Sequence, residues 1–244
     1  MRLDKVIEQQ LNTSRKEMKR LFQQGKVLVD QRIEGRPERN VDSAIHQIMV
    51  AGRQLETQER YYIVNKPNGV VTANVDQQHQ TVIDLIAPKD QHPDLYAVGR
   101  LDRDTEGLVL VTTNGQLGYD LLHPTKKVTK RYEVVVNDLV TPEDVAAFAT
   151  GITFHGGVTC KPAVLTIIDA RAARSFVSLE IAEGKFHQVK KMFLARGKKV
   201  IQLKRTAMGS LVLPDDLAVG SYRSLTQEEL RGLAAHFRGE RGRK

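Results

Sequence analysis

The first 57 residues combine apolar positions at helical spacing with short apolar runs. Between residues 3 and 11 apolar side chains recur every three or four positions, which predicts a helix with one buried face. A second helix is predicted to begin at Ser14, because Ser14 and Glu17 have the spacing of a capping box, and to end at Gly25. The segments "KVLVD", "RI" at 32–33 and "QIMVAG" predict a small sheet packed on both helices. Residues 1–57 are therefore expected to form a small α/β domain.

The rest of the chain is rich in predicted strands. Apolar runs or alternating patterns mark "YYIVNKP", "GVVTA", "LVLV" at 108–111, "RYEVVV", "AVLTII" and "SFVSLEI", and the strand at 108–111 is expected to end in a turn at Asn114-Gly115. Three helices are predicted, in "TPEDVAAFATG", "HQVKKMFLARG" and "TQEELRGLAAHF". Because strands and helices do not alternate regularly, residues 58–233 are expected to form an α+β domain around a mainly antiparallel mixed sheet. Residues 234–244 are expected to be a basic tail.

Composition sets the broad class of the protein. A chain of 244 residues with 41% hydrophobic and 27% charged residues can bury a full core, with one large and one small domain. No apolar stretch approaches the roughly 20 residues that span a bilayer, and the N-terminus lacks the apolar segment of a signal peptide. The single cysteine, Cys160, excludes an internal disulfide and fits a reducing compartment. We therefore expect a cytoplasmic protein without membrane association.

Positive charge is concentrated in a few segments. The net charge is +8, and the stretch from Gly184 to Pro214 holds eight lysines and arginines and no acidic residue. The other basic groups are the predicted helix face Arg15, Lys16, Lys19 and Arg20, the run Lys126, Lys127, Lys130 and Arg131, and the tail residues Arg238, Arg241, Arg243 and Lys244. Such groups can be no more than solvated faces, or can bind a membrane surface. Separate basic segments without an amphipathic anchor favour a nucleic acid.

A second concentration of charge lies in "GRLDRDTEGLVLV", where Arg100, Asp102, Asp104 and Glu106 crowd against the predicted strand. Carboxylates beside basic segments suit chemistry on a sugar or a base. A metal site would need a third ligand that the segment does not supply, so we expect no metal. A purely structural role for the cluster is the main alternative.

The motifs resemble two known families. "RLDKVIEQQL" and "SRKEMKRLFQQGKVLVD" resemble the S4 domain, a small RNA-binding module. "GRLDRDTEGL", followed in order by "KRY", "EGKFHQVKKMF" and "LKRTAMG", resembles the RsuA family of ribosomal RNA pseudouridine synthases, and the match extends from Arg2 to Leu233.

This resemblance implies roles for individual residues. Asp102 is implied to be the catalytic nucleophile or base, and Lys190 is implied to lie beside it, where many relatives have arginine. Tyr132 is implied to stack on the captured uracil. Arg100, expected on the same strand face as Asp102, is implied to fill the space left by the flipped base. Asp104 and Glu106 have no comparable role, and His187 is expected to be a structural residue. The residues expected to bind RNA elsewhere are Arg15, Lys16, Lys19, Arg20, Lys130, Lys185 and Lys191.

The resemblance also implies a reaction and a partner. The chain is expected to isomerise one uridine of 16S ribosomal RNA to pseudouridine without a cofactor, as a monomer, within an assembling small ribosomal subunit. Three alternatives stay open: a sister enzyme that modifies 23S ribosomal RNA, a non-catalytic assembly factor with an S4 domain, and an RNA N-glycosidase that would release free uracil.

Overall fold

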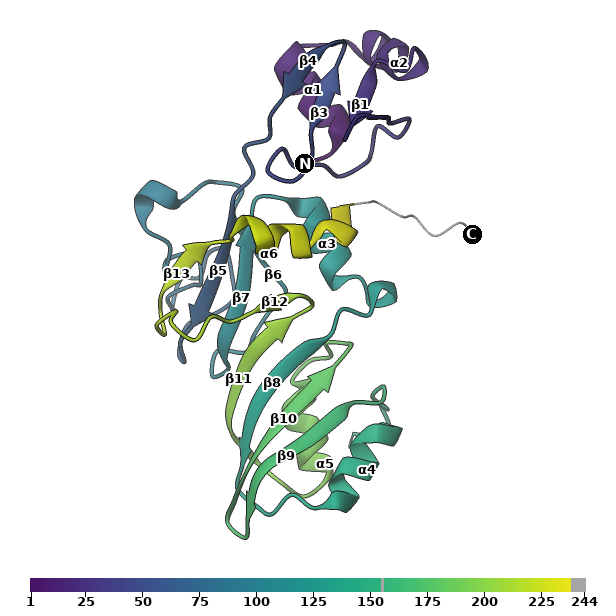
Figure 1. Cartoon of the computed structure of the whole chain (residues 1–244). Helices are drawn as coiled ribbons and strands as arrows, with labels where there is room; N and C mark the ends of the chain where they lie inside the picture. Colours follow the sequence, from purple (N-terminus) through teal and green to yellow (C-terminus); the bar gives the residue numbers. More distant parts are fainter. Residues whose placement is uncertain (155, 238–244) are drawn as a thin grey trace.

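The structure, a computed structural model, describes residues 1–154 and 156–237. A small N-terminal domain lies at one end of an elongated molecule, and a large sheet extends from the middle of the molecule to the other end (Figure 1). Among the described residues, no helix is long and apolar enough to cross a bilayer. The tail residues Arg238, Arg241, Arg243 and Lys244 lie outside the described part of the chain.

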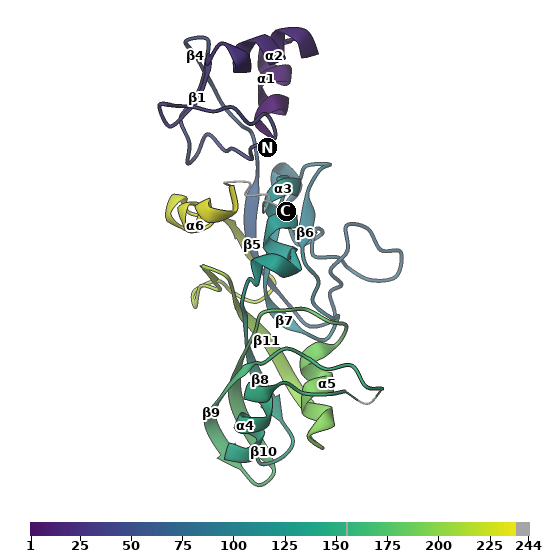
Figure 2. The same cartoon turned by 90° about the vertical axis from the view of Figure 1, so that its right-hand side faces the viewer.

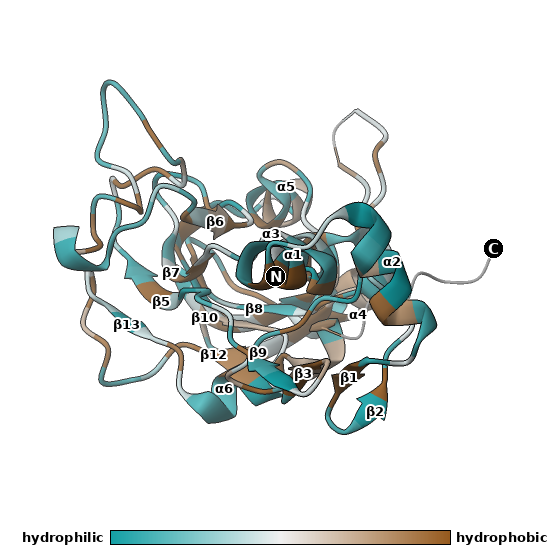
Figure 3. Cartoon of the chain, turned by 90° about the horizontal axis from the view of Figure 1, so that it is seen from above, coloured by the Kyte–Doolittle hydropathy of each residue, from teal (hydrophilic) through white to brown (hydrophobic). Residues whose placement is uncertain are grey.

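The N-terminal domain has two helices, α1 (Leu3–Leu11) and α2 (Arg15–Gln23), and a four-stranded antiparallel sheet. The strands are β1 (Val27–Val29), β2 (Arg32–Ile33), β3 (Ile48–Val50) and β4 (Arg53–Leu55), in the order β2-β1-β3-β4. The predicted capping box is confirmed, because the Ser14 hydroxyl accepts from the amide of Glu17 and the Glu17 carboxylate accepts from the amide of Ser14. Most of α2 is hydrophilic, whereas β1 and β3 are apolar (Figure 3). One face of α2 is therefore free to meet a partner.

The second sheet has nine strands and confirms the predicted α+β class. The strands are β5 (Tyr61–Lys66), β6 (Tyr96–Val98), β7 (Glu106–Thr112), β8 (Lys130–Val136), β9 (Val164–Arg171), β10 (Arg174–Ile181), β11 (Val200–Met208), β12 (Leu211–Val212) and β13 (Tyr222–Ser224). Their order is β13-β5-β7-β11-β8-β10-β9, with β6 paired to β7 and β12 to β11. All pairs are antiparallel except β7 with β11, where Lys204 and Arg205 lie opposite Glu106 and Gly107. This short parallel contact joins the two halves of the sheet.

Helices cover the two halves separately. They are α3 (Gly115–Leu122), α4 (Pro142–Thr150), α5 (Gln188–Ala195) and α6 (Gln227–Gly232), with short 3-10 helices at Pro88–Asp90, Pro124–Lys126 and Ala234–Phe237. Phe148 of α4 and Phe193 of α5 are fully buried, and their ring centres are 4.9 Å apart. Both belong to the same core as the buried residues of β8 and β10, so α4 and α5 cover one face of that half, with α5 alongside β11 (Figure 2).

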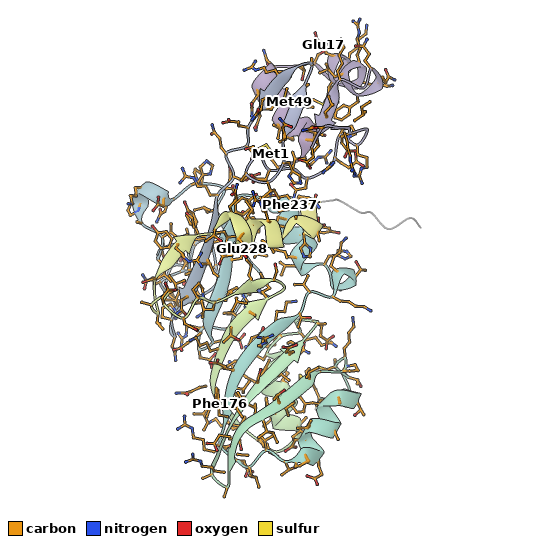
Figure 4. All side chains as sticks on the ribbon, viewed as in Figure 1. Met1, Glu17, Met49, Phe176, Glu228 and Phe237 are labelled. Atoms are coloured by element: carbon orange, nitrogen blue, oxygen red, sulfur yellow. The ribbon has the colours of Figure 1, made fainter. Side chains whose placement is uncertain are left out.

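The two domains are joined by polar contacts. The amino group of Met1 lies 2.9 Å from Glu59, and the hydroxyl of Tyr61 donates to Asp42 at 2.5 Å. The rings of His46 and Phe237 are 5.8 Å apart across the same junction, where Figure 4 shows Met1 and Phe237. Asp42 and His46 are buried, so the small domain is attached by ordered side chains as well as by the linking chain.

Several local predictions were wrong. "GVVTA" forms no strand, because only Val71 pairs, in an isolated bridge to Thr81. Asn114 is not in a turn: its side chain caps α3 by accepting from the amide of Leu117. The predicted tail begins too early, since residues 234–237 are helical and Phe237 is fully buried in the core beneath α6. The strands β4, β6, β11, β12 and β13 and the helix α3 were not predicted. Of these, β11 pairs with β7 and β8, and β13 pairs with β5, all far away in the sequence.

Candidate active site

The candidate site begins at the loop between β6 and β7, which carries Asp102. Gly99 leaves β6 with a φ of +78°, a conformation that favours glycine. The amide of Thr105 donates to the carbonyl of Asp102 at 3.0 Å and closes a tight turn before β7 begins at Glu106. The prediction that Arg100 and Asp102 share a strand face was therefore wrong, because this segment is a loop. Loops held on rigid strands are typical sites of chemistry.

A buried lysine that sequence reasoning missed holds this loop in place. Lys66, the last residue of β5, is fully buried and donates to the carbonyls of Pro67 at 2.9 Å, Val70 at 2.6 Å and Arg103 at 3.1 Å. Burial lowers the pKa of Lys66 to about 8, and the nearby carboxylates, led by Asp104, oppose that shift. The available signal was a lysine directly after an apolar strand and directly before Pro67.

The helix α5 supplies a cation to the loop, as predicted. The ammonium of Lys190 lies 2.9 Å from Oδ2 of Asp102 and 2.5 Å from Oδ1 of Asp104. Burial alone would lower the pKa of Lys190, but the hydrogen bonds to Asp104 and Asp102 raise it above its ordinary value. Burial opposes the ionisation of Asp104, yet Lys190 holds the pKa of that carboxyl below its usual range. Asp104, for which no role was expected, thus shares the lysine with Asp102.

His187 also reaches the Asp102 carboxylate. Its Nε2 lies 3.5 Å from Oδ1 of Asp102. His187 directly precedes α5, and its backbone φ of +54° is uncommon for a residue with a side chain. In this conformation the imidazole faces the loop that carries Asp102. Asp102 therefore lies between Lys190 and His187, with about a quarter of its side chain exposed.

A cavity of about 90 Å³ opens beside Asp102. Its other side is built from Tyr132 of β8 and from apolar side chains of the core, including Leu203. Tyr132 is 8% exposed, so only an edge or part of a face of its ring meets the cavity. The remaining lining residues are Arg100, Leu101, Thr105, Ile181, Gly184, Lys185, His187, Gln188, Val189 and Lys190. The predicted Asp102, Lys190, Tyr132 and Arg100 therefore meet at one cavity.

The residues predicted to bind RNA elsewhere fall into three groups. The α2 residues Arg15, Lys16, Lys19 and Arg20 are all exposed. Lys185 and Lys191 flank the cavity; the ammonium of Lys185 donates to Glu183 and to the carbonyl of Thr159, and that of Lys191 lies over two phenylalanine rings.

Lys130 was wrongly predicted to lie on the RNA surface. It is 9% exposed, and its ammonium donates to the carbonyl of Val128 at 3.0 Å. Arg205, counted among the basic residues of the 184–214 stretch, is also buried, and its Nε donates to the carbonyl of Leu108. Both lie on adjacent strands of the sheet, where their stems pack in the interior.

Within residues 1–154 and 156–237, no three histidine, cysteine or carboxylate side chains lie together in a way that could hold a metal ion. The two carboxylates of the loop instead share the ammonium of Lys190. A carboxylate paired with an ammonium group, in a cavity that an aromatic ring also lines, can bind a planar base and act on the sugar attached to it.

Comparison with known proteins agrees with this geometry. Residues 60–195 match the family model described as RNA pseudouridylate synthase, and residues 1–44 match that of the S4 domain. An uncharacterized RNA pseudouridine synthase of Bacillus subtilis, YtzG, is 40% identical over 231 residues, which cover 94% of this chain and 97% of that protein. Ribosomal small subunit pseudouridine synthase A of Escherichia coli K12 is 39% identical over 236 residues, which cover 94% and 98%.

A solved structure is also similar over nearly the full length. It is described as the crystal structure of pseudouridylate synthase, with 34% sequence identity and a TM-score of 0.67, and the match covers 96% of this chain and 99% of that one. Both domains therefore have counterparts in a single known protein.

Proposed function

This chain belongs to the RNA pseudouridylate synthase family and carries an S4 domain, and from that membership we propose that it isomerises one uridine of 16S ribosomal RNA to pseudouridine, with Asp102 as the catalytic residue. The enzyme class follows from the family. The choice of 16S ribosomal RNA is supported by relatives named ribosomal small subunit pseudouridine synthase A, such as that of E. coli K12, which match along almost the whole chain.

The reaction makes one bond and breaks another on the same ribose carbon. The bond from that carbon to N1 of uracil breaks, the base turns, and C5 bonds to the carbon; the proton of C5 is lost and N1 gains one. A carboxylate can promote this by attacking the ribose carbon or by removing a ribose proton. We assign this step to Asp102, because it is the carboxylate that lines the cavity.

The position of Asp102 beside the ammonium of Lys190 carries the proposal. A carboxylate in a closed pocket loses solvation, which disfavours its charged form. Lys190 at 2.9 Å offsets that cost and keeps the carboxylate available for the reaction. Lys66 acts further away: through the carbonyl of Arg103 it fixes the turn on which Asp102 stands, and is a positioning residue.

The target base must leave its helix or loop before its glycosidic bond can be reached. Tyr132 offers a ring for the captured uracil, and such stacking contributes about 1–3 kcal/mol per base. Arg100 is exposed at the rim of the cavity, where its guanidinium can occupy the space that the base leaves and contact the RNA backbone.

The S4 domain supplies affinity in this proposal. Its four exposed cations on α2 have no acidic counterpart on that helix except Glu17, which is engaged in the capping box. Phosphate contacts of this kind orient an RNA without reading its sequence. Selection of the uridine is then left to the cavity and its surroundings.

The test is to incubate the protein with unmodified transcripts of 16S and 23S ribosomal RNA and to map pseudouridine in each. We expect one modified uridine in 16S ribosomal RNA. The Asp102→Asn variant should keep its fold and its RNA affinity but form no product, and Glu106→Gln, in the same charged segment, is the matched control and should stay active.

Other outcomes identify the alternatives. Modification of 23S ribosomal RNA alone would replace the proposed substrate, and release of free uracil would indicate an N-glycosidase. Binding without any product from the wild-type protein would indicate an assembly factor. Turnover by Asp102→Asn within about tenfold of the wild-type rate would remove Asp102 from the catalytic role.

A further inference from the structure

One phenylalanine stands in solvent at the mouth of the active-site cavity. Phe186 is 69% exposed, whereas the other six phenylalanines, all within the described residues, are buried or half-buried. A large aromatic side chain left in water forgoes the free energy of burial. An exposed ring beside a functional site is free to stack on a ligand that enters the site.

The ring is held in a fixed position relative to the catalytic loop. Phe186 stacks on the imidazole of His187, with ring centres 3.8 Å apart and an interplanar angle of 21°. His187 in turn lies 3.5 Å from Asp102. Lys185 and His187, the neighbours of Phe186 in sequence, both line the cavity. The ring of Phe186 thus continues the wall of the cavity outward.

One cation lies over the ring, and a second one lies in the cavity wall. The ammonium of Lys191 lies 4.9 Å from the centre of the Phe186 ring and 5.8 Å from that of Phe154. Lys185, which precedes Phe186 and lines the cavity, pairs with Glu183 and keeps about a third of its side chain exposed. A ring with adjacent ammonium groups can accept the base of a nucleotide by stacking and its phosphate by charge. A lipid or an apolar protein surface would require a continuous apolar patch, and the adjacent residues Lys185 and His187 are polar.

We propose that Phe186 is a stacking site for an unpaired nucleobase next to the target uridine in the RNA. Tyr132 lies inside the cavity and Phe186 outside it, so the two rings can hold two neighbouring nucleotides, one flipped and one at the mouth. No hydrogen-bonding group of Phe186 reads the base, so the site accepts purines and pyrimidines. This inference rests on the proposed function, because it takes the nucleotide in the cavity to be the target uridine.

The test compares Phe186→Ala, Phe186→Leu, Phe186→Tyr and Phe186→Trp in steady-state and single-turnover assays on the unmodified ribosomal RNA transcript that the wild-type protein modifies. Loss of one stacked base corresponds to about a 5- to 150-fold weaker binding. We expect the alanine and leucine variants to raise KM by that factor with kcat nearly unchanged, because the contact is made equally in the bound state and in the transition state. The tyrosine and tryptophan variants should retain wild-type KM.

Val164→Ala is the matched control, since Val164 is 62% exposed on β9 and does not line the cavity. It should change neither constant. If Phe186→Leu has the KM of the wild type, while Phe186→Ala does not, then Phe186 acts by apolar packing and the proposal fails. If kcat falls while KM stays constant, Phe186 only supports His187, and the proposal also fails. If the wild-type protein modifies 23S instead of 16S ribosomal RNA, only the proposed substrate is refuted. The same variants assayed on 23S ribosomal RNA would still test the stacking site.

Discussion

Replacing Lys66 by methionine tests how a buried lysine fixes the loop that carries Asp102. The ammonium of Lys66 is fully buried and donates to the three carbonyls of Pro67, Val70 and Arg103. Methionine has a similar length but no donor, so three carbonyls lose the ammonium, and among the described residues only that of Arg103 keeps another donor, the amide of Gly69. Hydrogen bonds from a charged group contribute about 1.5–3 kcal/mol each, and three of them about 4–9 kcal/mol.

The cost of burying the charge offsets part of that stabilisation. Burial lowers the pKa of Lys66 from 10.5 to about 8, which corresponds to about 3 kcal/mol against the charged form. The net expectation for Lys66→Met at pH 7 is a loss of about 1–6 kcal/mol in the free energy of unfolding. Because the turn 102–105 would lose one of its anchors, kcat should fall as well, with KM less affected.

The pH dependence of this difference has a definite sign. With a folded-state pKa of about 8 and an unfolded value of 10.5, the folded state releases a proton that the unfolded chain still holds between these pH values. The stability of the wild-type protein therefore rises with pH in this window relative to Lys66→Met. Linkage predicts that its advantage over the variant widens by about 1.3 kcal/mol between pH 7 and pH 9.

Urea unfolding of both proteins, followed by circular dichroism at pH 7, 8 and 9, measures this difference, and Lys89→Met controls for loss of an exposed lysine. A Lys66→Met variant that is as stable as the wild type at pH 7 would refute the role of the three hydrogen bonds. A difference that stays constant or narrows toward pH 9 would refute the cost of burial.

Three further predictions concern the other parts of the site. Lys190→Met should lose single-turnover activity at the acidic end of its pH range, because Asp102 and Asp104 lose their shared cation. Lys190→Arg should keep most activity. If the acidic side of the pH–rate profile of Lys190→Met is the same as in the wild type, the ion pair has no catalytic effect. Gly107→Ala should be destabilised by about 4 kcal/mol or more in thermal unfolding, since Gly107 has a φ of +101° and a Cβ there would lie 2.2 Å from the carbonyl oxygen of Arg205. The control is Gly115→Ala: there is open space around Gly115, so this variant should unfold like the wild type. The exposed cations of α2 are Arg15, Lys16, Lys19 and Arg20. Substituting all four by glutamine should reduce the slope of log affinity against log salt concentration by about 3. An unchanged slope would show that the RNA binds elsewhere.

The local elements could be predicted because the information for each one lies within a few residues. The capping box of Ser14 and Glu17 sets the start of α2, and the run at 108–111 is apolar enough to be a buried strand wherever it pairs. Asp102 could be selected as the candidate catalytic residue from the ten-residue motif "GRLDRDTEGL". In each of these cases neighbouring residues alone decide the outcome.

The site itself required the tertiary structure. Lys190 meets Asp102 across 88 positions of sequence, and they meet because α5 leads into β11, which pairs in parallel with β7 just beyond the loop. The burial of Lys130 carried no sequence signal, and that of Lys66 only a weak one, since a lysine at a strand end is ordinarily exposed. Asp104 was expected to have no role in the site, and the exposure of Phe186 is known only from the structure.

Sequence alone thus indicated the helices α1, α2, α4 and α5 and strands such as β5, β7, β8 and β10, favoured a polyanionic partner, and pointed to Asp102 as the carboxylate for chemistry. The tertiary structure decided that Asp104 shares Lys190 with that carboxylate, which lysine is buried beneath its loop, and which aromatic ring is left in solvent. The physical reason is that propensity, capping and charge act over a few residues, whereas burial and ion pairing depend on strands and helices that are far apart in the chain.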